Sequence, residues 1–338
     1  MLCVYDPLYA NHLRGIPHPE CTERVEAVAA ALRRSGALND LLPARDATDE
    51  EIERVHTPQY LQLVRDEIGA MRGHAGYLST GDTVVDRGSL SVARRAAGGA
   101  IVAALEAFER KEAVFALVRP PGHHAEPDRG MGFCIFNNVA IAARAVQTRT
   151  GARTLIVDFD YHHGNGTQAV AGDGLAYLST HAYPAYPGTG GPAENYVLTD
   201  RDVVVNLPLP SHGFGTEPFL AAWQVLLDRV VDYVRPNMLL VSAGFDYIAG
   251  DAVGDLGVDV CAASSLAGLL HGAARAYCDG RIAYTLEGGY GIAALTESIE
   301  RIMKAHDADA APNSIAEAAE VIPEPQRMLL GRIEAMLR

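Results

Sequence analysis

Three residues whose side chains can bind a metal ion alternate along the stretch that follows residues 154–157. They are Asp158, Asp160 and His162, and the run before them is apolar enough for a buried parallel strand. Alternate residues of an extended chain share one face, so we expect these two carboxylates and the imidazole to point the same way. Buried carboxylates repel each other unless a cation neutralises them. The stretch predicts a metal site; a strand that ends at the surface with solvated acids would give the same pattern.

Polar residues also follow the ends of other apolar runs. These segments are Arg119-Pro120-Pro121-Gly122-His123-His124 after 113–118, His181 after 175–180, Gly244-Phe245-Asp246 after 238–241, and Glu287-Gly288-Gly289-Tyr290 after 282–286. In an open parallel sheet, ligands bind at the carboxyl ends of the strands. Each short motif by itself is more often a turn or a packed side chain than a site. Together, at one rim, they predict a functional site.

The residue types indicate which chemistry this rim performs. Asp160, His162 and Asp246 offer one nitrogen and two oxygen ligands, which leaves open positions as a catalytic zinc site requires. Iron(II), manganese or cobalt would fit the same donors. One imidazole of the pair His123 and His124 is expected to act as general base and the other as acid or electrostatic partner, provided that a turn at Gly122 brings both to the metal.

Three further residues complete the expected catalytic group. Asp158 is available to hold one of the two imidazoles, and Asn165 the other. An aspartate raises the basicity of an imidazole more than an amide does, so the pair should titrate unequally. The hydroxyl of Tyr290, which follows two glycines, is placed to donate to a developing oxyanion.

Strands and helices alternate along most of the chain. Strands are expected at 2–5, 113–118, 153–159, 175–180, 202–207, 237–243 and 281–286. Helices are expected at 22–32, 49–72 (two short ones), 89–110, 138–147, 217–234, 262–277 and 292–305, and a last helix runs to Arg338. The stretch 73–88 reads as an irregular glycine-rich loop and 308–325 as a tail. This order predicts an α/β fold whose mostly parallel sheet of about seven or eight strands carries helices on both faces. We find no linker, so a single domain over 1–338 is expected.

Composition narrows the class of protein. The 338 residues carry a formal net charge of -14, which argues against direct binding to nucleic acid. The five cysteines form no C-x-x-C pair, as expected for reduced thiols in a cytoplasmic protein. We see no signal peptide and no apolar run of the ~18 residues that a membrane span needs. Homo-oligomerisation stays open.

Several stretches resemble the histone deacetylase and acetylpolyamine amidohydrolase superfamily, which shares its three-layer α/β fold with arginase. The matching stretches are His18-Pro19-Glu20-Cys21, Arg119 to Ala125, Gly132 to Asn138, Val157 to Gln168, Tyr186-Pro187-Gly188-Thr189-Gly190, Ser242 to Asp246 and Leu286 to Tyr290. Asn165 and the Leu286 to Tyr290 run are more similar to class II enzymes and their bacterial relatives than to class I. The resemblance implies a zinc amidohydrolase with one zinc ion per chain that removes acetyl groups from acetylated lysine peptides or small acylated amines.

The resemblance also implies a role for individual residues. The zinc ligands would be Asp160, His162 and Asp246. The general base would be His123, bonded to Asp158, the second histidine would be His124, beside Asn165, and Tyr290 would polarise the amide carbonyl. Gly132, Phe133 and Tyr186 would flank a narrow acyl-lysine tunnel, and a structural potassium ion would lie near Asp158, Asp160, His162 and Ser179, with the backbone of Thr180.

The chain departs from the family pattern at three positions. Tyr186 stands where phenylalanine is usual, no proline follows Asp251, and Val253 replaces the glutamate of the polyamine-preferring class II relative. The last difference weakens, without removing, the hypothesis that the enzyme is an acetylpolyamine amidohydrolase. An arginase-type ureohydrolase would need a two-metal cluster. A non-catalytic acyl-lysine-binding module would be expected to lack one of the catalytic residues, and none is missing.

Overall fold

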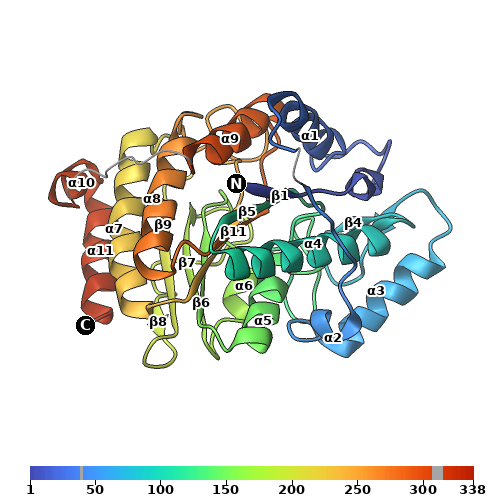
Figure 1. Ribbon diagram of the computed structural model, residues 1–338, viewed down its shortest axis with the longest axis horizontal. Helices are drawn as coiled ribbons and strands as arrows, with labels where there is room; N and C mark the ends of the chain where they lie inside the picture. Colours follow the sequence, from blue (N-terminus) through green and yellow to red (C-terminus); the bar gives the residue numbers. More distant parts are fainter. Residues whose placement is uncertain (39–40, 307–314) are drawn as a thin grey trace.

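A nine-stranded sheet forms the centre of the molecule in the computed structural model, which describes residues 1–38, 41–306 and 315–338 (Figure 1). The strands lie in the order β2-β1-β5-β11-β10-β6-β7-β9-β8, and every neighbouring pair is parallel except β8 and β9. Their bounds are β1 Leu2–Val4, β2 Leu41–Leu42, β5 Ala113–Ala116, β6 Thr154–Asp158, β7 Leu175–Ala182, β8 Tyr196–Val197, β9 Val203–Leu209, β10 Met238–Ala243 and β11 Ile282–Leu286. The predicted mostly parallel sheet is confirmed.

Helices cover both faces of this sheet, which gives three layers (Figure 1). On one face α4 packs on α5 and contacts β5 and β11; on the other, α7, α8, α9 and α1 pack side by side in that order. The bounds are η1 Pro7–Asn11, α1 Glu23–Ser35, α2 Asp49–Ile52, α3 Pro58–Ala70, α4 Ser89–Arg110, α5 Asn138–Thr150, α6 Asn165–Ala169, α7 Thr216–Val234, α8 Ala262–Tyr277, α9 Ile292–Ala305, α10 Ile315–Val321 and α11 Glu324–Met336.

Local sequence explains why the central elements form. All five residues of β6 are buried, as an apolar strand with helices on both faces requires. The helix that follows β5 is capped by Asn137, whose Oδ1 accepts from the amide of Ala140 at 3.1 Å, and it ends at Gly151, which has a φ of 70°. The alanine-rich α4 packs closely because Gly98 has no side chain: a Cβ there would lie 1.9 Å from the carbonyl oxygen of Arg45.

Some predicted boundaries are wrong. β6 ends at Asp158, so Asp160 and His162 lie in a loop and not on an extended strand; β7 continues to Ala182 and therefore contains His181. The 73–88 stretch is not wholly irregular, because β3 (Gly76–Tyr77) pairs with β4 (Val84–Val85). The two-residue strands β2 and β8 bring the sheet to nine strands because pairing, and not hydrophobic pattern, defines them.

The expected tail is helical in part. Helix α10 occupies residues that we expected to be irregular, and residues 308–314 of the tail lie outside the described residues. Within the described ranges, none of the helices combines the length and the hydrophobicity that crossing a bilayer requires.

Candidate metal centre and active site

Asp160, His162 and Asp246 come together at the carboxyl ends of β6 and β10, which are neighbours in the sheet. One ligand atom from each lies within 4.8 Å of the others, and all three side chains are buried. Nδ1 of His162 is 2.9 Å from Oδ2 of Asp246 and 3.3 Å from Oδ1 of Asp160. The three residues predicted to hold a metal ion thus point to one place.

Hydrogen bonds from the backbone, and not strand alternation, fold the loop that carries these ligands. The amide of Asp160 donates to Oδ1 of Asp158 at 3.1 Å, and the amide of His162 donates to Oδ1 of Asp160 at 2.9 Å. The amide of Tyr161 donates to Oδ1 of Asp246 at 2.9 Å. Each carboxylate therefore orders the loop around it, which fixes the ligand side chains where no regular strand does so.

The donor set fits a divalent cation. Two buried carboxylates face one imidazole, and two glycines make room for them: a Cβ on Gly288 would lie 2.6 Å from Oδ2 of both Asp160 and Asp246, and one on Gly244 would lie 1.8 Å from Oδ2 of Asp160. Burial and the negative charge of Asp160 raise the pKa of Asp246 to about 6. A cation between the two carboxylates removes this repulsion.

The paired imidazoles lie beside the metal-ligand group, on a turn that begins at Gly122. The rings of His123 and His124 have centroids 4.0 Å apart. Nδ1 of His123 is 3.0 Å from Oδ2 of Asp158, and Nδ1 of His124 is 2.9 Å from Oδ1 of Asn165. These are the two pairings that we expected from the sequence.

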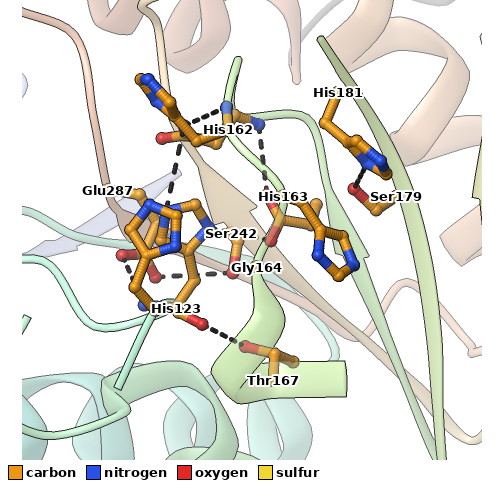
Figure 2. Close-up of polar contacts among 12 residues, drawn as sticks. His123, His162, His163, Gly164, Thr167, Ser179, His181, Ser242 and Glu287 are labelled. Atoms are coloured by element: carbon orange, nitrogen blue, oxygen red, sulfur yellow. Dashed lines mark hydrogen bonds and ion pairs between the residues drawn. The ribbon is translucent and has the colours of Figure 1, made fainter. Parts of the chain in front are cut away.

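Glu287 holds the turn that presents the two imidazoles. Its Oε2 accepts from the amides of Gly122 at 2.6 Å and of His123 at 3.1 Å, and the hydroxyl of Ser242 lies 3.4 Å from Oε1 (Figure 2). The carbonyl oxygen of His123 accepts from the amide of Thr167 in α6 at 3.1 Å. The turn is thus fixed at both its amide and its carbonyl side.

Their surroundings give the two imidazoles opposite charge preferences. Burial disfavours the charged form of His123, but the carboxylates of Asp158 and Asp160 outweigh it and raise its pKa to about 10. Burial, together with the positive charges of His123 and His162, holds the pKa of His124 well below its usual value. The unequal titration that we expected therefore has a structural basis.

Tyr290 closes the site from the end of β11. Its ring lies 5.9 Å from that of Phe133, and the guanidinium of Arg24 lies 4.9 Å from the ring centroid. Burial raises the pKa of Tyr290 well above its usual value, so the phenol is a neutral donor at ordinary pH. Its hydroxyl has no hydrogen-bond partner among the described residues and is free to donate to a ligand.

The residues expected to flank the substrate lie next to this group. The Tyr186 ring is 5.2 Å from that of His124, and the Phe133 ring is 4.7 Å from that of His18. Gly132 leaves no room for a side chain, since a Cβ would lie 2.3 Å from Cδ2 of His124.

Asp82, which is not among the predicted site residues, binds both Gly132 and Tyr186. Oδ1 of Asp82, an exposed residue, accepts from the amide of Gly132 at 2.8 Å and from the hydroxyl of Tyr186 at 3.3 Å. The hydroxyl that distinguishes Tyr186 from the usual phenylalanine is therefore used within the protein.

The residues expected near potassium are neighbours in β6 and β7. Asp158 pairs in register with Ser179, and Nδ1 of His181 lies 2.8 Å from the hydroxyl of Ser179 (Figure 2). Thr180 follows, and its buried Oγ1 has no hydrogen-bond partner in the part of the chain that the structure describes. Successive side chains of a strand point to opposite faces, so this Oγ1 points away from Ser179 and Asp158, and Thr180 would meet an ion there through its backbone.

Sequence reasoning missed a buried charge cluster behind the site. Oε1 of Glu20 accepts from Nη1 of Arg24 at 2.9 Å and from Nε of Arg119 at 2.6 Å, and all three side chains are buried. An arginine in the first turn of a helix looks solvated from the sequence, so no signal pointed to Arg24. For Glu287 there was a signal, because an acidic residue directly after a fully buried strand needs a partner.

The structure is that of a three-layer α/β protein with a candidate metal-ligand group at the rim of its sheet, and comparison with known proteins gives the family. Residues 18–306 match the family model described as "Histone deacetylase domain". The chain belongs to the histone deacetylase family.

Similar proteins carry deacetylase names. The chain is 34% identical over 296 residues to a "Probable deacetylase" of Archaeoglobus fulgidus, with 86% of this chain and 81% of the relative covered. It is 34% identical over 301 residues to "Histone deacetylase 15" of Arabidopsis thaliana, and this match covers 86% of this chain and 53% of the relative. It superposes on the "Crystal Structure of HDA15 HD domain" with a TM-score of 0.85 and 30% identity, covering 99% of this chain and 96% of that one.

Proposed function

We propose that this protein is a zinc-dependent amidohydrolase that removes acetyl or other acyl groups from acyl-lysine in proteins or from small acylated amines. Family membership supports deacetylase activity. The observation that carries the proposal of a metal-dependent mechanism is the group Asp160, His162 and Asp246, whose ligand atoms lie within 4.8 Å of one another. One imidazole nitrogen and two carboxylate oxygens are donors that a catalytic zinc ion accepts.

The chain's own residues divide the remaining work. When bound by these three ligands, zinc polarises the scissile carbonyl and a water molecule. Tyr290, neutral and without a partner among the described residues, donates to the carbonyl oxygen as negative charge develops on it. The Phe133 and Tyr186 rings lie beside the catalytic group, and we propose that the aliphatic stem of the substrate passes between them.

We assign the general base to His124, whereas the family resemblance led us to expect His123. A base must be neutral to accept a proton, and the low pKa of His124 keeps it neutral. Asp158 holds His123 in its charged form. Because Asp158 is not a zinc ligand in this proposal, the pairing of these two residues persists when the metal is bound. A charged His123 stabilises the anionic intermediate and supplies a proton to the leaving amine.

We also propose a structural potassium ion near Asp158, Ser179 and Thr180. The in-register pairing of Asp158 with Ser179, which brings the two residues together, supports it. An ion there would bind next to the Asp158 carboxylate and so stabilise the loop that carries Asp160.

The test is hydrolysis by the zinc-loaded protein of an acetyl-lysine peptide and of acetylspermidine. We expect turnover of at least one, abolished by a chelator and restored by zinc. The acetylspermidine arm is included because Asp82, an exposed carboxylate of the kind that attracts a cationic substrate, lies beside Tyr186. A metal-loaded protein that hydrolyses neither would contradict the proposal.

A further inference from the structure

Asp251 binds the backbone on which Tyr290 stands. Oδ2 of Asp251 accepts from the amide of Tyr290 at 2.6 Å and from the amide of Gly291 at 2.7 Å. Its Oδ1 accepts from the amides of Val253 at 2.9 Å and Gly254 at 3.4 Å. Both oxygens are therefore used, one by its own loop and the other by the loop of Tyr290.

The loop of Asp251 is rigidly joined to the metal-ligand group. It follows Asp246 in the chain, and a Cβ on Gly254 would lie 2.6 Å from the carbonyl oxygen of Asp246 and 2.5 Å from Cγ of Tyr161. The absence of a side chain at Gly254 lets the loop lie directly against Asp246 and Tyr161. Asp251 consequently fixes Tyr290 relative to Asp246.

Arg24 holds the same segment from its other side. Its Nε donates to the carbonyl of Gly289 and its Nη2 to the carbonyl of Glu287, both at 2.6 Å, while its guanidinium lies 4.9 Å from the Tyr290 ring centroid. A buried cation thus binds the carbonyls before Tyr290, and the Asp251 carboxylate binds the amides at and after it. Hydrogen bonds to ionised groups are roughly twice as strong as neutral ones, so this pair restricts the backbone on both sides.

Asp251 also binds the amide of Gly291, the N-cap residue of helix α9. Helix α9 begins at Ile292 after Gly291, whose lack of a side chain leaves the first amides without a local acceptor. Asp251, from another loop, supplies an acceptor at this end, and its negative charge lies near the start of the helix, where it is favourable.

We propose that Asp251 is a positioning residue for Tyr290: it sets the distance from the phenol hydroxyl to the scissile carbonyl. This inference rests on the proposed function. It predicts an effect on turnover larger than that on substrate binding, because Tyr290 donates most strongly when charge has developed on the carbonyl oxygen. A displacement of about 1 Å at a reacting group can cost ~100-fold in rate.

The experiment compares Asp251→Asn with Asp255→Asn in the zinc-loaded protein. Asp255 is a matched control, because it binds the same loop through the amides of Gly250 at 2.9 Å and Gly257 at 2.7 Å, whereas none of its hydrogen bonds among the described residues reaches the Tyr290 segment. We expect Asp251→Asn to lower kcat ~10- to 100-fold with KM within ~3-fold of wild type, and Asp255→Asn to change both by less than ~3-fold. Zinc content should be equal in all three proteins.

A double-mutant cycle separates positioning from general loosening of the fold. In the Tyr290→Phe background there is no hydroxyl to place, so adding Asp251→Asn should cost less than ~2-fold further. The same cycle is repeated for binding of a hydroxamate with a lysine-length alkyl chain, measured by calorimetry. There, Asp251→Asn should weaken binding about as much as Tyr290→Phe, by ~10-fold, and the double variant no more.

Each opposite outcome overturns the proposal. Equal losses in Asp251→Asn and Asp255→Asn, or a full loss from Asp251→Asn in the Tyr290→Phe background, would mean that Asp251 acts through general stability. If wild type lacks turnover but binds the hydroxamate, the proposed function fails while the binding cycle still decides the role of Asp251. If it does neither, both proposals fail.

Discussion

The imidazole of His123 donates from Nδ1 to Oδ2 of Asp158 across 3.0 Å, in a fully buried setting. The hydroxyl of Tyr177 donates to the same oxygen at 3.0 Å. A Cβ on Gly164 would lie 2.3 Å from that oxygen, so the glycine makes room for the pair. This contact keeps one imidazole of the pair charged beside a neutral one, which separates their roles in acid–base chemistry.

Replacing Asp158 by asparagine should move the alkaline limb of the pH–rate profile to lower pH. The carboxylate raises the pKa of His123 against the effect of burial, so its loss lets burial lower that pKa and deprotonates His123 at lower pH. We expect the alkaline limb of kcat/KM to shift by at least ~1 pH unit. Tyr177→Phe is the control, because it removes a bond to the same oxygen but leaves the charge. An unchanged alkaline limb in Asp158→Asn would show that charged His123 is not required.

Tyr290→Phe should leave a folded, zinc-containing protein with kcat lowered ~100- to 1000-fold, since one donor to the developing oxyanion is lost. Tyr247→Phe is a matched control, because it also removes a phenol hydroxyl, one that is buried in the core and has no hydrogen-bond partner within the described residues. Steady-state kinetics with an acetylated substrate measure both. Retention of most activity by Tyr290→Phe would remove the tyrosine from the mechanism.

Asp246→Ala should abolish stoichiometric zinc binding. It removes one of three ligands and leaves Asp160 and His162, which are too few to hold the ion tightly. Elemental analysis after dialysis should give about one zinc ion per wild-type chain and a small fraction of that for the variant. Asp259→Ala, at an exposed aspartate in the loop after the same strand, should keep its zinc. Full zinc occupancy in Asp246→Ala would place the metal elsewhere.

The sequence was sufficient to predict the rim of the sheet and the residues on it. Apolar runs that end in polar residues mark the carboxyl ends of parallel strands, and for this reason Asp160, Asp246 and Tyr290 could be placed together from the sequence alone. The parallel order of strands follows from their alternation with helices, and it is confirmed by β6, β10 and β11 lying side by side.

Other features depend on contacts that a linear pattern does not contain. The alternation of Asp158, Asp160 and His162 suggested a strand, but side-chain acceptors within the loop produce the arrangement. The bonds that Arg24 and Asp251 make could not be predicted, because their partners are backbone groups of a segment far along the chain. The cytoplasmic location, the single-domain organisation and the absence of nucleic-acid or membrane partners remain predictions.

Glu287 should make the free energy of unfolding depend on pH, and Glu287→Gln should remove this dependence. Burial raises its pKa from 4.5 to about 7, against the effects of His123 and the amides of Gly122 and His123. A carboxyl group whose pKa is higher in the folded than in the unfolded state stabilises the fold fully at pH values below its unfolded-state pKa. This stabilisation is lost as the pH rises through the folded-state pKa. Wild type should therefore lose stability from pH 4.5 to 7 through this group.

The comparison of Glu287→Gln with Glu287→Ala tests both the charge and the hydrogen bonds. The amide oxygen of glutamine can still accept from Gly122 and His123, so relative to wild type this variant should gain about 3 kcal/mol in unfolding free energy between about pH 4 and pH 8. Alanine leaves two buried amides without acceptors and should cost about 2–4 kcal/mol at about pH 5, together with a fall in kcat as the histidine turn loosens. Denaturant unfolding at several pH values measures these differences. The same pH dependence in wild type and Glu287→Gln would assign the titration to another group.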